Sequence, residues 1–356
     1  MKSMKKYIAV LLAAALILAA FAGCASKNNN AAPANTNTNT ENSANTDNNA
    51  VPAEPVTVRL GGLTGPTTIG LVKLLEDAEA GATENKYEFK LAGSADELTP
   101  LMIKGELDVL AGPANLAAVL CAKTEGKVQM AAVTTLGVLY ILTTAEISGT
   151  EPGWAQLKGQ TIYATGKGST PEYNLRYLLT KNGLDPDKDV AIEFKSEPAE
   201  ILAMYETSGN SKTFYAMLPQ PYATVAATKY PELKQLFDLS AEWDKLGEDS
   251  KMITACLMVR KEFADEHPEA VEALLKEYAA SSAWVNSNVD EAAALTEKYI
   301  GVKAAVAKKA IPLCNIVNIT GAEMKSAVSS YYKILFDQNP ASVGGSLPAD
   351  SFYYVK

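Results

Sequence analysis

Glycine, proline, hydroxyl and amide residues gather at five short segments of this 356-residue chain, each between an apolar run and a stretch with helical spacing. The segments are Thr64-Gly65-Pro66-Thr67-Thr68, Gly93-Ser94, Pro113-Ala114-Asn115, Lys167-Gly168-Ser169-Thr170 and Gln220-Pro221. The start of a helix offers free N–H groups and a positive dipole end, and glycine lets a ligand approach the backbone. The segments therefore predict a site for a small polar or anionic group. The alternative is that each segment only separates a strand from a helix.

Side chains near these segments narrow the choice of ligand. Lys167 is the cationic candidate, whereas most of the other polar residues carry hydroxyls or amides. Tyr140, Tyr173 and Tyr222 could stack on a planar ring, or could belong to the core or the hinge. We therefore expect a pyrimidine-like or other small heterocycle, with a small sulfonate or carboxylate as the second candidate.

Residue patterns of common catalytic sites are scarce in the sequence. The single histidine, His267, is expected at the surface, which disfavours Ser-His-Asp hydrolases and His-ligated metals. The segment 166–168 is not a Walker A loop, because Gly168 stands where a Ser or Thr would follow the lysine. Cys121, Cys256 and Cys314 are too far apart for a zinc knuckle and are expected to be small buried residues, with one disulfide as the alternative. We expect no enzyme activity, no metal and no cofactor.

The composition is that of a globular protein, with 47% apolar and 21% charged residues. At about 150 residues per domain, the length suggests two domains. The formal net charge of −9 repels phosphate backbones, so we expect no nucleic-acid partner.

The first 24 residues have the pattern of an export signal. Lys2, Lys5 and Lys6 precede an apolar stretch over 7–22, which is shorter than the roughly 20 residues of a membrane span. Residues 25–55 are rich in Asn, Thr, Ala and Ser and are predicted to be a disordered tether. The end of this signal, Gly23-Cys24, leaves two possibilities open: a lipoprotein signal, or an ordinary signal peptide or short anchor helix.

The rest of the chain predicts alternating strands and helices. Apolar runs predict strands over 56–60, 87–91, 108–111, 128–133, 138–143, 161–164, 190–194 and 214–218. Ser94 and Glu97 have capping-box spacing at the start of one helix. From about residue 261 the pattern is mostly helical. Strands separated by helices predict an α/β fold with parallel units, in which ligands bind beyond the carboxyl ends of the strands. The layout suggests two lobes, with the second inserted in the first or beside it.

Several of these motifs resemble known families. Residues 21–24, Phe-Ala-Gly-Cys, resemble the bacterial lipobox, although Leu is usual where Phe21 stands. The chain also resembles substrate-binding lipoproteins of bacterial ABC importers, in the type II group that binds nitrate, taurine, alkanesulfonates and thiamine-pyrimidine precursors. The motifs that carry this resemblance lie at 65–68, 105–109, 113–117, 157–162, 168–171 and 218–223, where Gln220 replaces the usual Glu.

The resemblance implies a type II fold of two lobes, each a mostly parallel sheet flanked by helices. Residues 1–23 would be removed, and Cys24 would be lipidated and anchor a monomer on the extracytoplasmic face of the cell membrane. Lobe 1 would comprise 56–143 plus 253–356, and lobe 2 would comprise 144–252. The five segments and Tyr140 would hold a small-molecule ligand between the lobes. Hinge closure would then present the ligand to an ABC permease and its ATPase.

Two other functions remain open. A lipoprotein of this kind could present its ligand to a sensor, which the sequence does not distinguish from import. Some proteins that resemble this fold are enzymes of pyrimidine or quinone-precursor synthesis. They are cytosolic, whereas this chain carries the pattern of an export signal.

Overall fold

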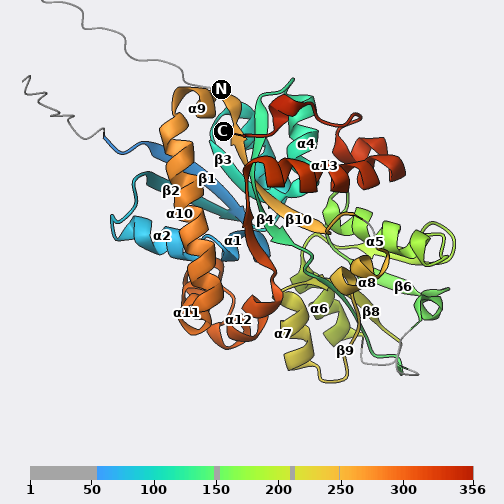
Figure 1. Ribbon diagram of the computed structural model, residues 1–356. Helices are drawn as coiled ribbons and strands as arrows, with labels where there is room; N and C mark the ends of the chain where they lie inside the picture. The colour runs from blue at the N-terminus through green and yellow to red at the C-terminus, as the bar shows by residue number, and fades with distance from the viewer. Residues whose placement is uncertain (1–53, 148–152, 209–212, 248, 356) are drawn as a thin grey trace, which may run out of the picture. The chain divides into compact units, whose positions relative to one another are not determined.

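Two β-sheets form the frame of the computed structural model, which describes residues 54–147, 153–208, 213–247 and 249–355 (Figure 1). All of these residues belong to one compact unit. The predictions of a signal peptide, a lipidated Cys24 and a tether up to residue 53 lie outside the described residues.

Sheet 1 has six strands. In spatial order they are β11 (Ile316–Ile319), β4 (Val128–Leu136), β10 (Ile253–Arg260), β3 (Val109–Pro113), β1 (Thr57–Leu63) and β2 (Lys86–Ala92). Strand β1 runs parallel to β2 and β3, whereas β10 runs antiparallel to β3 and β4. Strand β11 is antiparallel to β4.

Sheet 2 has five strands. In spatial order they are β7 (Ala191–Phe194), β6 (Thr161–Ala164), β8 (Tyr215–Pro219), β5 (Leu139–Thr143) and β9 (Lys234–Asp238). Strand β6 runs parallel to β7 and β8, and β5 runs antiparallel to β8 and β9.

Each sheet holds antiparallel strands but is mostly parallel in strand direction, as expected: β1, β2, β3 and β4 share one direction in sheet 1, and β6, β7, β8 and β9 share one direction in sheet 2. The chain passes from sheet 1 to sheet 2 between β4 and β5, and it returns before β10. The strand that follows each passage, β5 or β10, runs against its neighbours in the new sheet. The first crossover also lies earlier than the predicted 142–143, because β5 already belongs to sheet 2 and the change falls at Gly137-Val138.

Helices pack on both faces of sheet 1. Successive residues of a strand face opposite sides, so Val109 and Ala111 of β3 face one core and Leu110 faces another. The first core holds α2 (Val72–Glu79), α9 (Lys261–Glu266) and α10 (Pro268–Ser287). The second core holds α3 (Ala95–Lys104), α4 (Ala114–Lys123) and α13 (Gly321–Gln338).

Helices α6 (Pro198–Thr207) and α7 (Tyr222–Lys229) pack on one face of sheet 2. Helices α5 (Thr170–Lys181) and α8 (Leu239–Lys245) pack on its other face and share the core that holds α4 and α13. This shared core joins the two sheets. A further cluster holds α1 (Pro66–Ile69), α11 (Val289–Ile300) and α12 (Ala304–Ala310). The 3-10 helices are η1 (Trp154–Leu157), η2 (Ile311–Leu313), η3 (Pro340–Val343) and η4 (Asp350–Phe352).

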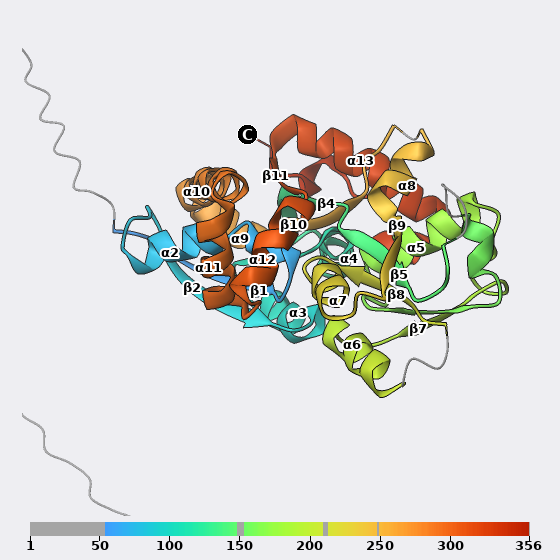
Figure 2. The same ribbon diagram turned by 90° about the horizontal axis from the view of Figure 1, so that it is seen from below.

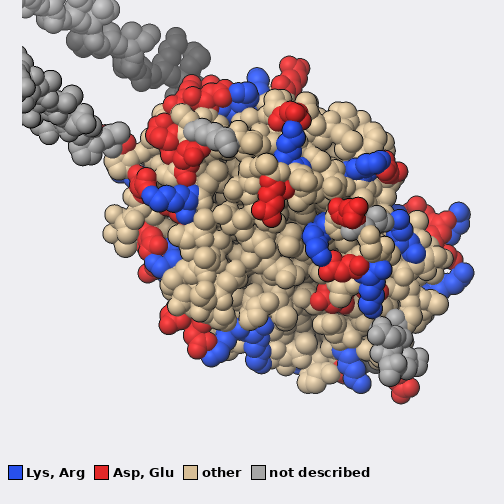
Figure 3. Space-filling view, in the orientation of Figure 1, with Lys and Arg blue, Asp and Glu red and all other residues tan. Residues whose placement is uncertain are grey.

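Charges of both signs are interspersed on the face shown in Figure 3. Acidic residues of α9 and α10 lie on the surface near basic ones, as in the Lys261–Asp265 pair with N···O 2.7 Å. None of the helices in the described ranges combines the length and apolar character that crossing a membrane requires.

Candidate functional site

The carboxyl ends of strands in both sheets meet at a contact that we call the polar junction, formed by Asn115, Gly168, Thr170 and Thr254. The side-chain amide of Asn115, in the first turn of α4, donates to the carbonyl of Gly168 at 3.4 Å. The hydroxyl of Thr170, the first residue of α5, donates to the carbonyl of Thr254 at 3.2 Å. Asn115 follows β3 and Thr254 belongs to β10, and both strands are in sheet 1. Gly168 and Thr170 follow β6 of sheet 2, so both bonds join elements of the two sheets.

The start of α4 is buried and leaves one polar atom without a partner. Ala114 and Asn115 are 0% and 1% exposed. The Asn115 amide nitrogen also donates to the carbonyl of Ser342 at 3.0 Å, and the Tyr332 hydroxyl of α13 donates to the carbonyl of Ala114 at 2.5 Å. The Asn115 Oδ1 atom, at the other end of the amide, has no partner among the described residues. Pro113 is the residue that precedes the helix.

The start of α5 forms the opposite side of the polar junction. Ser169 stands at the N-cap, and its hydroxyl donates to the carbonyl of Gly166 at 2.7 Å. The N–H of Gly168 donates to the carboxylate of Glu172 at 2.7 Å. Lys167 is exposed, so the predicted cation stands at the surface beside the junction rather than in its buried part.

The loop after β1 uses its threonine hydroxyls to stabilise itself. Thr67 and Thr68 donate to the carbonyl of Leu63 at 3.2 and 2.7 Å, and Thr64 donates to the carbonyl of Ala92 at 3.2 Å. Gly65 has a φ of 144°, which favours glycine, and a Cβ added to it would meet nothing within 4 Å. This glycine backbone therefore adjoins open space at the edge of sheet 1. Pro66, next in the chain, begins α1.

Gly93 and Ser94 precede α3 and show the predicted capping box with Glu97. They also lie near sheet 2, because a Cβ on Gly93 would collide with the carboxylate of Glu197, the N-cap residue of α6. Figure 2 shows α3 beside α6. The edges of the two sheets thus approach each other here as well as at the polar junction.

Two predicted site residues are buried and hydrogen-bonded within the protein: Gln220 to α7, and Tyr140 of sheet 2 to η2. Gln220 is 2% exposed, and its Oε1 accepts from the N–H and the hydroxyl of Thr224 at 3.3 and 2.8 Å. Tyr140 is 4% exposed, and its hydroxyl donates to the carbonyl of Leu313 at 3.4 Å. Burial raises the pKa of Tyr140 to about 12, so the phenol stays neutral at physiological pH.

The sequence analysis missed Thr254, Glu172 and Glu197. Glu172 had a signal, because Ser169 and Glu172 repeat the Ser-x-x-Glu spacing of Ser94 and Glu97. Thr254 had none, since only the return of the chain to sheet 1 brings it to α5.

Within the described ranges, the cysteines and acidic groups form neither a disulfide nor a metal-binding cluster. Cys121, Cys256 and Cys314 are free thiols, and burial raises the pKa of each. Among the described residues, no group of three His, Cys, Asp or Glu side chains is placed to hold a metal.

Two mixed sheets that meet at their strand ends define the class: the fold is that of the type II periplasmic binding proteins. The chain belongs to the NMT1-like family, whose sequence pattern matches residues 72–301. These findings agree with the resemblance seen in the sequence.

Solved structures share the fold at low sequence identity. An ABC transporter protein from Parabacteroides distasonis is 23% identical with a TM-score of 0.66, over 85% of this chain and 99% of that one. The periplasmic aliphatic sulphonate-binding protein SsuA from Escherichia coli is 19% identical with a TM-score of 0.64, over 81% and 88%. The periplasmic nitrate-binding protein NrtA from Synechocystis PCC 6803 is 16% identical with a TM-score of 0.60, over 83% of each chain. No curated protein sequence matches this chain.

Proposed function

We propose that this protein is an extracytoplasmic solute-binding lipoprotein, not an enzyme. It captures a small polar or heterocyclic solute between two lobes and delivers it to the permease of an ABC transporter. The observation that carries the proposal is the polar junction, where Asn115 and Thr170 bond across the two sheets. A solute that contacts both sheets stabilises the closed arrangement over the open one, which is how binding becomes a conformational signal.

The site between the lobes combines Gly65, Gly93, Asn115 and the segment 167–170. Lobe 1 is sheet 1 with its helices, and lobe 2 is sheet 2 with its helices. The similar fold of sulphonate-binding and nitrate-binding proteins supports a binding role.

A thermal-shift screen tests the binding role. The panel holds pyrimidines, thiamine precursors, sulfonates, nitrate and amino acids. A ligand at 100 times its Kd adds about 2.7 kcal/mol to the free energy of unfolding, which raises the melting temperature visibly.

The variant Ser169→Lys places a long charged side chain in the polar junction and is expected to abolish the shift. Ser287→Lys is the matched control, because Ser287 also donates its hydroxyl to a carbonyl, at 2.9 Å, but on the exposed end of α10. Unchanged affinity in the folded Ser169→Lys variant would contradict the assignment of the site.

Anchoring is tested separately through Cys24, which is proposed to carry the lipid. Cys24→Ala is expected to leave the precursor unprocessed or to release the protein from membranes. Acyl labelling that persists in this variant would reject the lipid anchor.

A further inference from the structure

The backbone N–H groups that could hold an anion at the start of α3 are already bonded to the protein's own carboxylate. The Oε1 atom of Glu97 accepts from the N–H groups of Gly93 and Ser94, both at 3.1 Å. It also accepts from the Ser94 hydroxyl at 3.4 Å. A ligand oxyanion would have to displace this carboxylate and would then lie beside its negative charge.

At the start of α5, a backbone N–H is likewise bonded to a carboxylate of the protein itself. The Gly168 N–H donates to Oε2 of Glu172 at 2.7 Å, and Oε1 of Glu172 accepts from Arg176 at 2.8 Å. The same arginine donates to Asp187 at 2.8 Å. The arginine nearest this helix start is therefore engaged with two carboxylates and offers little to a bound anion.

A second carboxylate approaches Gly93 from sheet 2. A Cβ placed on Gly93 would lie 3.6 Å from the Oε1 atom of Glu97 and would collide with the carboxylate of Glu197. In the described part of the chain, neither carboxylate forms an ion pair with a Lys or Arg.

The polar junction adds unpaired oxygen atoms. The Asn115 nitrogen donates to two carbonyls, which fixes the orientation of the amide and leaves Oδ1 as a buried acceptor with no partner within the described ranges. The Thr254 hydroxyl, which can donate or accept, is also buried and has no partner in the described part of the chain. An unmet buried acceptor costs about 1–3 kcal/mol, which an N–H group of a ligand would recover.

We propose that this site takes a neutral or positively charged ligand that carries N–H donors and rejects oxyanions such as sulfonate and nitrate. The inference rests on the proposed binding function. Glu97 and Glu197 supply negative charge, and Asn115 supplies a buried acceptor. Lys167 remains exposed at the rim.

Isothermal titration of the purified protein with four probes tests this inference. The probes are agmatine, thymine, ethanesulfonate and nitrate. Binding of agmatine or thymine, without binding of either anion, is the expected result. The double variant Glu97→Gln/Glu197→Gln keeps the acceptors but removes both charges, and is expected to weaken agmatine at least tenfold or to gain affinity for the anions. Glu269→Gln, on the exposed start of α10, is the matched control and should change neither.

Saturable binding of ethanesulfonate or nitrate to the wild-type protein would overturn the ligand class. If Ser169→Lys abolishes that binding, the proposed function stands and only this inference fails. A double variant that folds normally and binds all probes as the wild type does would also overturn it. Failure of all four probes, in both forms, would contradict the site together with the inference.

Discussion

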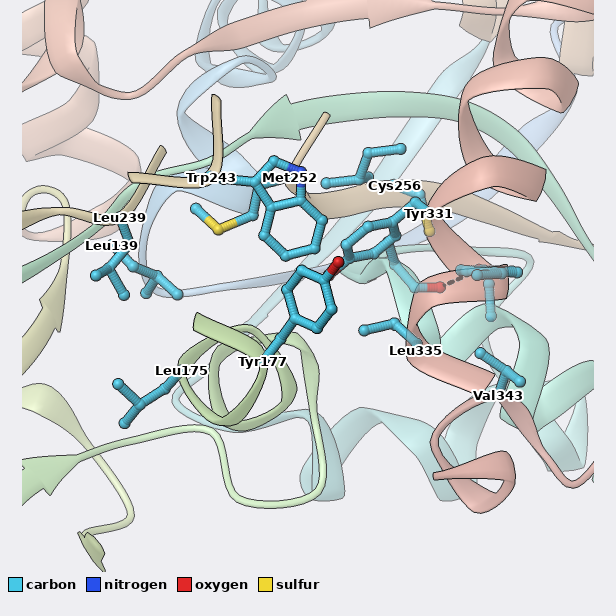
Figure 4. Close-up of a cluster of buried hydrophobic side chains, with 14 of the residues drawn as sticks. Leu139, Leu175, Tyr177, Leu239, Trp243, Met252, Cys256, Tyr331, Leu335 and Val343 are labelled. Atoms are coloured by element: carbon cyan, nitrogen blue, oxygen red, sulfur yellow. Dashed lines mark hydrogen bonds between the residues drawn. The ribbon is translucent and has the colours of Figure 1, made fainter. Parts of the chain in front are cut away.

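Two of the regions where elements of sheet 1 contact elements of sheet 2 differ in chemistry. One is the polar junction. The other, which we call the aromatic junction, consists of Tyr177 of α5, Trp243 of α8 and Tyr331 of α13 (Figure 4). Ring centroids lie 4.8 Å apart for Tyr177 and Trp243, and 5.8 Å apart for Trp243 and Tyr331.

The two regions differ in their aromatic area and in the length of their hydrogen bonds, although the Nδ2 atom of Asn174 beside the aromatic junction also lacks a partner among the described residues. In the aromatic junction the Tyr331 hydroxyl donates to Asn174 at 2.7 Å and the Trp243 N–H donates to the carbonyl of Ser250 at 3.0 Å. The polar junction has two long hydrogen bonds, of 3.4 and 3.2 Å, and the Asn115 Oδ1 atom and the Thr254 hydroxyl have no partner among the described residues. Buried aromatic area resists separation, whereas such hydrogen bonds are readily exchanged for water or a ligand. We therefore expect the lobes to pivot about the aromatic junction and to part at the polar junction.

Removing the central ring of the aromatic junction should have the largest effect. Trp243 is 0% exposed, so Trp243→Ala is expected to lower the free energy of unfolding by about 3–5 kcal/mol. Urea unfolding followed by circular dichroism measures this loss. Trp284→Ala, at a half-buried tryptophan of α10, is the control and should lower the free energy of unfolding by less. Equal losses would show that the aromatic junction contributes no more to stability than an ordinary half-buried tryptophan.

A methyl group at the first crossover should have the next largest effect. A Cβ on Gly137 would lie 2.9 Å from Cβ of Ser240 and would also collide with the Ser240 hydroxyl and with Met252, just before β10. Gly137→Ala is expected to destabilise the protein by about 1–3 kcal/mol, because both chain crossovers must shift. Thermal unfolding measures the effect. Gly153→Ala, where nothing lies within 4 Å, should be close to neutral; a similar loss at both glycines would refute the crowding argument.

Removing only the hydroxyl from the aromatic junction separates its hydrogen bond from its packing. Tyr331→Phe loses the bond to the buried Asn174 and is expected to cost about 1–2 kcal/mol, with ligand affinity unchanged. Urea unfolding and ligand titration measure the two quantities. A large change in affinity would mean that this region does more than hold the lobes together.

The smallest change in stability is expected at the polar junction. Thr170→Val removes the hydroxyl that bonds Thr254 and should cost about 1 kcal/mol or less. It should nevertheless weaken whichever panel compound binds, because the closed arrangement loses one of its bonds. Urea unfolding and ligand titration measure the two effects in this variant as well. A stability loss above that of Tyr331→Phe, with unchanged affinity, would reverse the comparison between the two regions.

The sequence indicated the local structure well, for physical reasons. Apolar runs bounded by glycine or proline predicted β1 to β8 to within a few residues at each end. Ser94 and Glu97 form the predicted capping box, because its bonds join residues only three or four apart. The sequence analysis missed β9, β10 and β11, although β10 lies in a mostly apolar run over 253–260.

Only part of the candidate site could be found in this way. The sequence predicted that Asn115 and Thr170 lie at helix starts. It did not predict that they bond to Gly168 and Thr254. It also suggested that Gln220 faces a ligand, whereas its amide accepts two bonds from Thr224 one turn along α7. The direction of a side chain depends on neighbours that local pattern does not specify.

The sequence by itself determined the class of fold, the helix starts and the types of residue at them, because these follow from local sterics and hydrophobic periodicity. The tertiary structure decided that β5 belongs to sheet 2, that both sheets are mixed, and that Glu197 faces Gly93 from the other sheet. A buried strand has the same apolar pattern whichever strand it pairs with, so only the long-range packing of the whole chain selects its neighbours.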